Sequence, residues 1–335
     1  MKPLFSPSGD LHPVNIINPF RNPSGGSEWE AYTLWEMLSQ RTKAACWYST
    51  STANAFWKDE KRVQYLTPMK YLSEIRNSNC VYVGVYWKPK SWLKIARPRR
   101  QIILANTLDY YDFVNLVGYL RKVGPEPEVV CVSKFLADVL GVEAVIHPSP
   151  INVDLFRPAI EHRSSSDDRV VIGRLSRDEL SKHHFLYDPS LYQHFADKGC
   201  KVRLMGGTCM RRMIKASDNI ELMPAMAEPA PKFLHSLDIF FYRTGTWLET
   251  FGRVIFEAMA CGLPVVAHVY GGHKDFIEHG VDGFLFETQD EAISILEELR
   301  KNPELRRQVG LAARRKVESM FSESELSKRL SFYCT

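Results

Sequence analysis

Short apolar runs rich in β-branched and aromatic residues alternate along the chain with stretches whose apolar residues recur at helical spacing. Ten such runs predict strands, at residues 14–18, 81–86, 102–106, 129–132, 144–147, 170–173, 202–205, 238–242, 265–268 and 283–286. Between them, Ala31, Leu34, Trp35 and Leu38 follow the i, i+3, i+4, i+7 spacing of one helix face. Strands that alternate with helices form parallel sheets covered by helices on both sides. The pattern therefore predicts an α/β protein.

One segment interrupts this alternation. Residues 148–168, PSPINVDLFRPAIEHRSSSDD, combine three prolines with a Ser/Asp run, which is typical of a linker. We therefore predict an N-terminal α/β domain at 1–150, a linker at 151–168, a C-terminal α/β domain at 169–320 and a terminal helix at 321–335. Ligands of open α/β sheets bind beyond the carboxyl ends of the strands, so we expect the two domains to face a central cleft.

Composition and charge narrow the class of protein. The 335 residues exceed what one hydrophobic core usually serves, and 45% hydrophobic with 24% charged residues is typical of a globular enzyme. The formal net charge of +4 is too small to indicate a nucleic-acid partner. The sequence contains no apolar run long enough for a transmembrane helix, and its N-terminus lacks the apolar run of a secretory signal.

The seven cysteines are scattered and odd in number, and none forms a Cys-x-x-Cys pair. This spacing predicts neither a disulfide framework nor a structural zinc site. A reducing cytoplasm suits such a chain best.

A glycine pair follows the first predicted strand. Gly25 and Gly26 lie between that strand and the first helical pattern, where glycine lets a ligand approach the backbone and a helix start offers free N–H groups. A diphosphate would fit there. The alternative is a plain strand-to-helix turn with Ser27 as the helix cap.

Two cations follow the first predicted strand of the second domain. Arg174 leaves the carboxyl end of that strand, and Lys182 comes eight positions later. Together they are suited to neutralising a departing diphosphate. The alternative is that both are solvated surface charges, because other charged residues surround them.

Two carboxylates flank an apolar helical pattern in residues 249–272, ETFGRVIFEAMACGLPVVAHVYGG. We predict a helix that starts near Thr250 or Phe251, with Glu249 at its cap and Glu257 about two turns in. At about 1.5 Å per residue the two carboxylates are roughly 12 Å apart, close to the distance between the sugar and the ribose of an extended nucleotide-sugar. The amides of Thr250, Phe251 and Gly252 would then face its phosphates. The alternative is one capping glutamate and one solvated glutamate.

Residues from Trp247 to Phe286 carry a family pattern. ETFGRVIFEAMACGLPVVAHVYGGHKDFIEHGVDGFLF resembles the retaining glycosyltransferases of family 4, which have the GT-B fold of two Rossmann-like α/β domains. GGSEWEAYTLWEML resembles the family's glycine-rich loop and first helix, and VVIGRLSRDELSKHH its diphosphate-binding segment. The terminal SMFSESELSKRLSFY resembles the last helices, one of which returns to the first domain in this fold.

The resemblance implies roles for individual residues. Glu257 would bind the donor ribose, Glu249 would contact the transferred sugar, and Arg174 with Lys182 would hold the diphosphate. Gly26 would approach the same diphosphate from the first domain. The donor would be a UDP- or GDP-linked sugar, and no metal or other cofactor is expected; the sequence has no Asp-x-Asp pair suited to a divalent cation.

The chain departs from the family at two places. Its arginine and lysine are three residues further apart than is usual. Where many relatives carry a histidine near the reacting carbon, QIILANTLDYYDF has none, and Asn106 or Asp109 falls nearest. The acceptor, a glycan, lipid or small molecule, is not predicted. In a retaining front-face reaction the leaving phosphate oxygen can take the proton of the acceptor hydroxyl, so the reaction does not require the missing histidine.

Three further stretches carry alternatives. Residues 86–100 have six basic and no acidic residues, with Trp87 and Trp92 among them. Such a run suits peripheral contact with the anionic inner membrane surface, a place near an anionic acceptor, or a basic loop with the tryptophans partly in the core. His273, Lys274 and Asp275 either line the sugar pocket or form a structural turn. The backbone groups of residues 222–226 are candidates for recognising the nucleotide base.

Two other functions remain to be weighed. One is a non-catalytic nucleotide-sugar-binding protein with a degenerate acceptor side. The other, a dinucleotide-dependent dehydrogenase, requires a glycine fingerprint after the first strand, and PFRNPSGGSE is not one.

Overall fold

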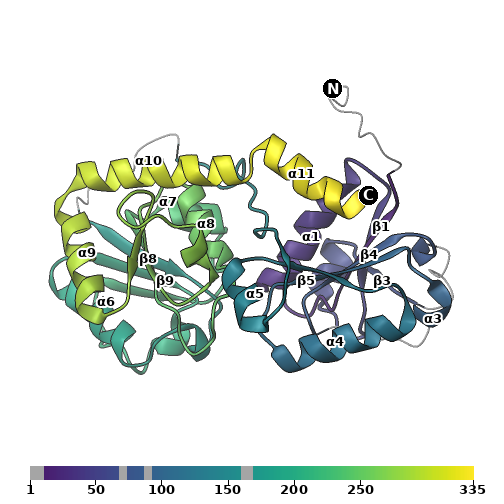
Figure 1. Cartoon of the computed structure of the whole chain (residues 1–335). Helices are drawn as coiled ribbons and strands as arrows, with labels where there is room; N and C mark the ends of the chain where they lie inside the picture. Colours follow the sequence, from purple (N-terminus) through teal and green to yellow (C-terminus); the bar gives the residue numbers. More distant parts are fainter. Residues whose placement is uncertain (1–10, 68–73, 87–92, 160–168) are drawn as a thin grey trace. The chain divides into compact units, whose positions relative to one another are not determined.

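The computed structural model describes residues 11–67, 74–86, 93–159 and 169–335. The chain divides into two compact units, one formed by Met1–Pro150 with Glu323–Thr335 and the other by Ile151–Ser322. Each unit has its own parallel sheet with helices on both faces (Figure 1). The predicted α/β class with two Rossmann-like domains is confirmed.

The sheet of the first unit has seven parallel strands in the order β3-β2-β1-β4-β5-β6-β7. The strands are β1 Val14–Asn18, β2 Ala44–Tyr48, β3 Gln64–Tyr65, β4 Asn79–Val83, β5 Arg100–Ala105, β6 Glu128–Cys131 and β7 Val145–Ile146. The helices are α1 Gly26–Ser39, α3 Leu93–Ala96, α4 Tyr110–Val123, α5 Lys134–Leu140 and α11 Glu323–Cys334, with a π-helical turn at Phe56–Glu60. The chain runs outward from β1 in both directions, which is the doubly wound order.

The terminal helix α11 belongs to the first unit. Asn79 donates from Nδ2 to the backbone oxygen of Tyr333 over 2.9 Å, and Arg100 donates to that of Phe332 over 2.7 Å. His147 and the Tyr333 hydroxyl also form a hydrogen bond of 2.9 Å. These bonds tie α11 to the ends of three segments of the N-terminal sheet.

The sheet of the second unit has six parallel strands in the order β10-β9-β8-β11-β12-β13. The strands are β8 Val171–Leu175, β9 Lys201–Met205, β10 Ile220–Met223, β11 Ile239–Tyr242, β12 Val265–His268 and β13 Phe284–Phe286. The helices are α6 Tyr187–Asp197, α7 Ala230–His235, α8 Arg253–Ala260, α9 Gln289–Lys301 and α10 Pro303–Met320, with 3-10 turns η2 Leu180–Lys182, η3 Thr208–Met210 and η4 Gly272–Asp275.

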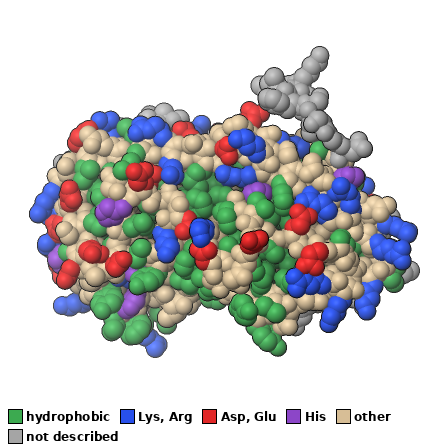
Figure 2. Space-filling view, viewed as in Figure 1, with side chains coloured by type: hydrophobic (Ala, Val, Ile, Leu, Met, Phe, Trp, Pro, Cys, Tyr) green, Lys and Arg blue, Asp and Glu red, His purple; other side chains and the backbone are tan. Residues whose placement is uncertain are grey.

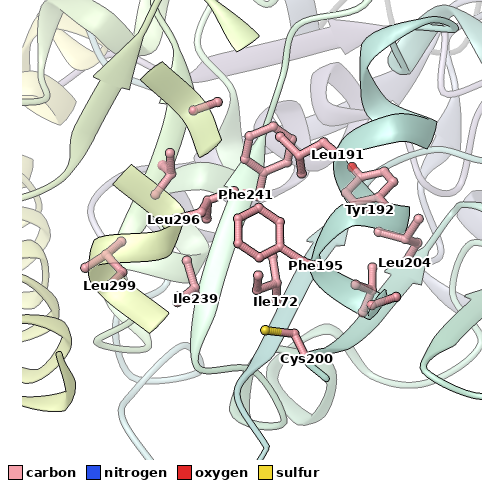
Figure 3. Close-up of a cluster of buried hydrophobic side chains, with 14 of the residues drawn as sticks. Ile172, Leu191, Tyr192, Phe195, Cys200, Leu204, Ile239, Phe241, Leu296 and Leu299 are labelled. Carbon is pink, nitrogen blue, oxygen red and sulfur yellow. The ribbon is translucent and has the colours of Figure 1, made fainter. Parts of the chain in front are cut away.

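Aromatic and aliphatic side chains fill the core of the second unit. Figure 3 shows Phe195 of α6 beside Phe241 of β11, with Leu296 and Leu299 of α9 nearby; all four are buried. Phe241 also stacks on Phe286 with ring centroids 5.4 Å apart. Because burying one such side chain contributes about 1.5–3 kcal/mol, this cluster fixes α6 and α9 on the same face of the sheet.

Three observed strands, β2, β3 and β10, were not predicted. β2 has the sequence AACWY and β10 the sequence IELM, and both are only partly buried. The short β3 is exposed. Strands near a sheet edge need fewer apolar residues, so their sequences lack the run that marks a central strand.

On the face shown in Figure 2, basic and acidic side chains are interspersed over the surface. Within the described residues, no helix is both long enough and apolar enough to cross a bilayer.

Candidate functional site

Lys182 and Glu249 meet at the carboxyl edge of the second sheet. Lys182 ends η2, which follows β8, and Glu249 lies in the loop that follows β11; these two strands are paired neighbours. The Lys182 ammonium donates to Glu249 Oε1. The Tyr242 hydroxyl donates to the same oxygen over 2.7 Å. The Lys182 and Glu249 side chains are 9% and 15% exposed, so the pair is largely but not completely enclosed.

The Glu249 carboxylate is held in its ionised form. Burial alone would raise the pKa of Glu249, but the charge of Lys182 and the hydrogen bonds from Lys182 and Tyr242 lower it below its usual value. Burial and the neighbouring Glu249 raise the pKa of Tyr242 well above its usual value. Tyr242 therefore stays protonated and serves as a donor. Sequence reasoning missed Tyr242, whose only signal was its place at a strand end.

Backbone contacts fix the loop that carries Glu249. The backbone oxygen of Glu249 accepts from the Gly272 amide over 2.8 Å, and the Trp247 amide donates to Ser181 over 3.0 Å. Thr244 Oγ1 donates to the backbone oxygen of Tyr270 over 2.5 Å. The loop is therefore held from the segments after β8 and after β12, which limits the positions open to Glu249.

Arg174 is not placed as the sequence suggested. We predicted a strand ending at Gly173 with Arg174 leaving its end, but β8 continues to Leu175 and the Arg174 side chain is fully buried. Its guanidinium donates to the backbone oxygens of Arg243, over 2.8 Å, and of Lys182. Turning it toward a ligand would take a donor from these two carbonyls and one of two cations from a buried acid, at a cost of about 1–3 kcal/mol for each buried group left unsatisfied.

That buried acid is Asp188, in the first turn of α6. Asp188 Oδ1 accepts from Arg243 Nε over 3.0 Å. Asp188 Oδ2 accepts from the His184 amide over 3.0 Å and lies 3.4 Å from an Arg174 nitrogen. The side chain is fully buried, and three donors converge on it, as expected of a carboxylate. Through Arg174 this network supports the turn that presents Lys182.

The helix that carries Glu257 starts later than predicted. α8 begins at Arg253, and Gly252 caps it with a left-handed backbone, φ 82° and ψ 57°. Thr250 and Phe251 therefore precede the helix, and Phe251 packs on Phe256 with ring centroids 4.4 Å apart. The predicted helix start near Thr250 or Phe251 is wrong because the left-handed turn at Gly252 separates these residues from the helix. The estimate of 12 Å, which placed Glu249 on the helix, no longer applies.

Glu257 lies in the second turn of α8 and is 8% exposed. Burial raises the pKa of its carboxyl group, and the charge of Arg253, 3.7 Å away, partly opposes that rise. A buried carboxyl group without a strong ion pair is suited to hydrogen bonding with uncharged hydroxyls.

Of the three residues predicted either to line a sugar pocket or to form a turn, His273 is buried and Lys274 and Asp275 are exposed. His273 forms a hydrogen bond with the backbone oxygen of His268, and burial lowers its pKa, which keeps the ring neutral. They form the 3-10 turn η4, which supports Gly272 and hence the Glu249 loop.

In the first unit, the glycine pair stands at a helix start as predicted. Gly26 is the first residue of α1, and Gly25 is its cap, with an extended backbone. Ser27 does not cap the helix; Asn18 Nδ2 instead donates to Ser27 Oγ over 3.1 Å. The strand-to-helix loop is thus fixed at the carboxyl end of β1.

Asn106 and Asp109, the two candidates on the acceptor side, make different hydrogen bonds. Asn106, just after β5, donates from Nδ2 to the buried Glu30 of α1 over 2.6 Å. Asp109 caps α4 by accepting from the Asp112 amide over 2.9 Å. Sequence reasoning missed Glu30, whose signal was an acid on the apolar first helix.

Two other predictions are only partly placed. Of the basic run at 86–100, residues 87–92 lie outside the described residues, as do residues 160–168 of the linker. Residues 222–226 comprise the last two residues of β10 and the three that follow, among which Met226 has φ 60° and is 55% exposed. Across the described residues, no cluster of three or more His, Cys, Asp or Glu side chains is arranged to hold a metal ion.

Comparison with known proteins matches a family to the part of the chain that carries the two glutamates of this site. Residues 209–316, which include both Glu249 and Glu257, match the family described as "Glycosyl transferases group 1". These residues form a glycosyl transferases group 1 domain. Arg174 and Lys182 precede the matched segment.

Curated relatives match over limited stretches. N-acetyl-alpha-D-glucosaminyl L-malate synthase of Bacillus anthracis is 39% identical over 92 residues, 25% of this chain and 23% of the relative. Spore coat protein SA of Bacillus subtilis (strain 168) is 31% identical over 100 residues, 29% of this chain and 26% of the relative. Capsular polysaccharide biosynthesis glycosyltransferase CapM of Staphylococcus aureus is 28% identical over 189 residues, 52% of this chain and 48% of the relative. The chain thus spans about a quarter to a half of these relatives.

Solved structures match over nearly the whole chain. HepE of Anabaena, in complex with UDP and glucose, matches with a TM-score of 0.73 at 16% identity. The match covers 96% of this chain and 98% of the HepE chain. WaaG, a glycosyltransferase involved in lipopolysaccharide biosynthesis, matches with a TM-score of 0.66 at 12% identity, over 96% of this chain and 99% of the WaaG chain. The glycosyl transferases group 1 domain therefore belongs to a chain with the GT-B fold.

Proposed function

We propose that the chain is a retaining glycosyltransferase of family 4 that transfers a sugar, such as a hexose, from a UDP- or GDP-linked donor to a glycan, lipid or small-molecule acceptor. The observation that carries this proposal is the Lys182–Glu249 pair at the carboxyl edge of the second sheet, with Glu257 on the following helix. HepE, which shares the fold, has been crystallised with UDP-glucose, and this supports a UDP-linked donor here.

In this proposal the charges of the site act on the leaving group. The bond between the anomeric carbon and the phosphate oxygen breaks, and the acceptor oxygen bonds to the same face of that carbon. The acceptor proton passes to the leaving phosphate oxygen. Lys182 neutralises the diphosphate as its charge grows, which lowers the barrier because the interaction is stronger in the transition state.

The carboxylates orient the donor. Glu249, ionised and partly exposed, accepts hydrogen bonds from the sugar hydroxyls, and Glu257 accepts from the ribose diol. On the first unit, Gly25 and Gly26 are proposed for phosphate contact and Asn106 or Asp109 for the acceptor side. No metal is proposed, since Lys182 and backbone amides supply the positive charge.

A thermal-shift screen against UDP, GDP, ADP and TDP tests donor binding. A ligand at 100 times its dissociation constant adds about 2.7 kcal/mol to the free energy of unfolding. Transfer or hydrolysis is then measured with the matching nucleotide-sugars, with and without EDTA. Equal rates in the two arms support metal-free chemistry, and loss of activity with EDTA contradicts it.

Glu249→Gln and Glu257→Gln are compared with Glu304→Gln, whose carboxylate is 55% exposed on α10. Both site variants are expected to lose about a hundredfold or more in transfer rate, while the α10 variant matches the parent. Normal turnover in both site variants contradicts the proposal.

The alternative is a non-catalytic nucleotide-sugar-binding protein, favoured by one observation: Asn106 pairs with Glu30 where many relatives carry a histidine. Nucleotide binding without hydrolysis or transfer of any matching donor supports this alternative. Cytoplasmic location and membrane contact through residues 86–100 stay predictions, which fractionation and vesicle flotation test.

A further inference from the structure

Two cations lie against one exposed tryptophan at the edge of the site. Arg177 Cζ is 5.7 Å from the centroid of the Trp247 ring, and Lys182 Nζ is 5.8 Å from it. Trp247 is 37% exposed. Cations close to an aromatic face are attracted to its negative quadrupole. Trp247 therefore holds a second cation in the neighbourhood of Lys182, and that cation is not Arg174.

The backbone around Arg177 is held in place. Arg177 is the second residue after β8, and the preceding Ser176 amide donates to Met205 over 2.9 Å. The Trp247 amide donates to the backbone oxygen of Ser181, in the turn η2 that follows the loop of Arg177, over 3.0 Å. The loop and the tryptophan are thus joined by a backbone bond as well as by the ring contact.

The Arg177 guanidinium is available to a ligand, whereas that of Arg174 is not. The Arg177 side chain is 27% exposed, and its ion-pair partner Glu179, 3.2 Å away, is 45% exposed. Exposed pairs of this kind contribute little, so a phosphate can replace the Glu179 carboxylate at small cost. Arg174 is fully enclosed and bonds to backbone carbonyls.

The charge of Arg177 also reaches the centre of the site. Burial and Glu249 raise the pKa of Tyr242, and the charge of Arg174 and, less strongly, that of Arg177 oppose that rise. Since Tyr242 donates to Glu249, Arg177 acts on the same group of side chains as Lys182.

We infer that Arg177, rather than Arg174, is the second cation that binds the donor diphosphate beside Lys182, and that Trp247 positions both. The inference rests on the proposed function, because it assigns residues of the same donor site. A guanidinium presents a planar fork of donors that matches phosphate oxygens, which an ammonium does not. Arg177 would thus provide directed hydrogen bonds, and Lys182 a compact charge.

The test uses isothermal titration of the full chain with the best-binding nucleoside diphosphate of the four screened and with its monophosphate. The variants are Arg177→Ala, Arg177→Lys and Arg307→Ala, the last an exposed arginine of α10 that pairs with Glu304. Arg177→Ala is expected to weaken diphosphate binding about tenfold or more, and monophosphate binding less. Arg177→Lys should recover part of the loss, and Arg307→Ala should bind as the parent does.

Trp247 is tested by Trp247→Leu and Trp247→Phe in the same titration. If Trp247 positions the two cations, Trp247→Leu should bind the diphosphate more weakly than the parent. Trp247→Phe, which keeps an aromatic face, should retain most of the parent's affinity. Loss in both variants to the same extent contradicts the positioning role.

The outcomes separate this inference from the proposed function. If the parent binds none of the four diphosphates, the proposed function fails and the inference falls with it. If the parent binds a diphosphate and Arg177→Ala binds it equally well, or loses diphosphate and monophosphate affinity equally, the inference alone is overturned.

Discussion

Lys182 and Glu249 are 67 positions apart in the sequence, yet the ammonium of one donates to the carboxylate of the other. Both follow neighbouring parallel strands, so the sheet brings them together at its carboxyl edge. Without a donor, each neutralises the other at a largely enclosed position. A bound sugar diphosphate would have to break this ion pair. Its phosphate would then bind Lys182, and its sugar hydroxyls would donate to Glu249.

We expect a double-mutant cycle to measure this pair. Lys182→Met and Glu249→Gln each leave an opposite charge without its partner, whereas the double variant removes both charges. The coupling in the free energy of unfolding should be about 1–3 kcal/mol, measured by urea denaturation. Strictly additive single effects would show that the pair contributes nothing to stability.

Asp188→Asn is expected to destabilise the second unit by about 3–5 kcal/mol, because the amide group turns a donor toward two buried arginines that the carboxylate now balances. Chemical denaturation monitored by circular dichroism checks this. Asp218→Ala, at an exposed position, is the control and should change stability by less than about 0.5 kcal/mol. A small effect of Asp188→Asn would mean that the network is not needed for folding.

His183 should make the protein less stable in acid. Burial and the charge of Arg174 lower the pKa of His183 to about 3 from its ordinary value of 6.5. Between these values the unfolded chain binds a proton that the folded chain does not, so stability falls as the pH drops below 6.5.

The expected loss from His183 is on the order of 2–3 kcal/mol between pH 6.5 and a pH of about 4.5. Urea unfolding at both pH values, in the parent and in His183→Gln, measures it. The variant should show a shallower decline with acidity, and an unchanged slope would contradict the assignment. His147 and His268, whose pKa values burial also lowers to about 4, should leave a residual slope.

Gly310→Ala should destabilise the packing of α10 on α8. A Cβ at Gly310 would lie 2.1 Å from the backbone oxygen of Gly262, so the helix would have to move away. We expect a loss of about 1–3 kcal/mol, as for overpacking elsewhere. Thermal and urea denaturation of the variant provide the measurement.

Gly118→Ala is the matched control for that substitution. Gly118 lies within α4, and a Cβ there would meet no atom within 4 Å. Alanine should therefore stabilise the protein by about 0.4–1 kcal/mol, because it restricts the unfolded chain without a clash. If both glycine variants behaved alike, close helix contact would not explain the effect at Gly310.

Much of the fold was predictable because central parallel strands are buried on both faces and must be apolar throughout. β1 and β12 occupy the predicted residues 14–18 and 265–268. The partly buried β2 and β10 lack such runs and were missed. The two α/β halves likewise followed from local patterns, whereas Glu249, predicted at a helix cap, lies in the loop before Gly252.

The sequence by itself determined the alternation of elements and the presence of acids and bases at strand ends, since hydrophobic periodicity and composition are local properties. Only the tertiary structure decided which of those charges a ligand can reach. Arg174 and Arg177 are both basic residues near the end of β8, but the strand continues to Leu175 and Asp188 of a later helix, together with two carbonyls, encloses the first. The second lies beyond the strand against Trp247 and remains partly exposed. The direction of a side chain depends on partners far away in the sequence, and for that reason no local pattern distinguishes the two arginines.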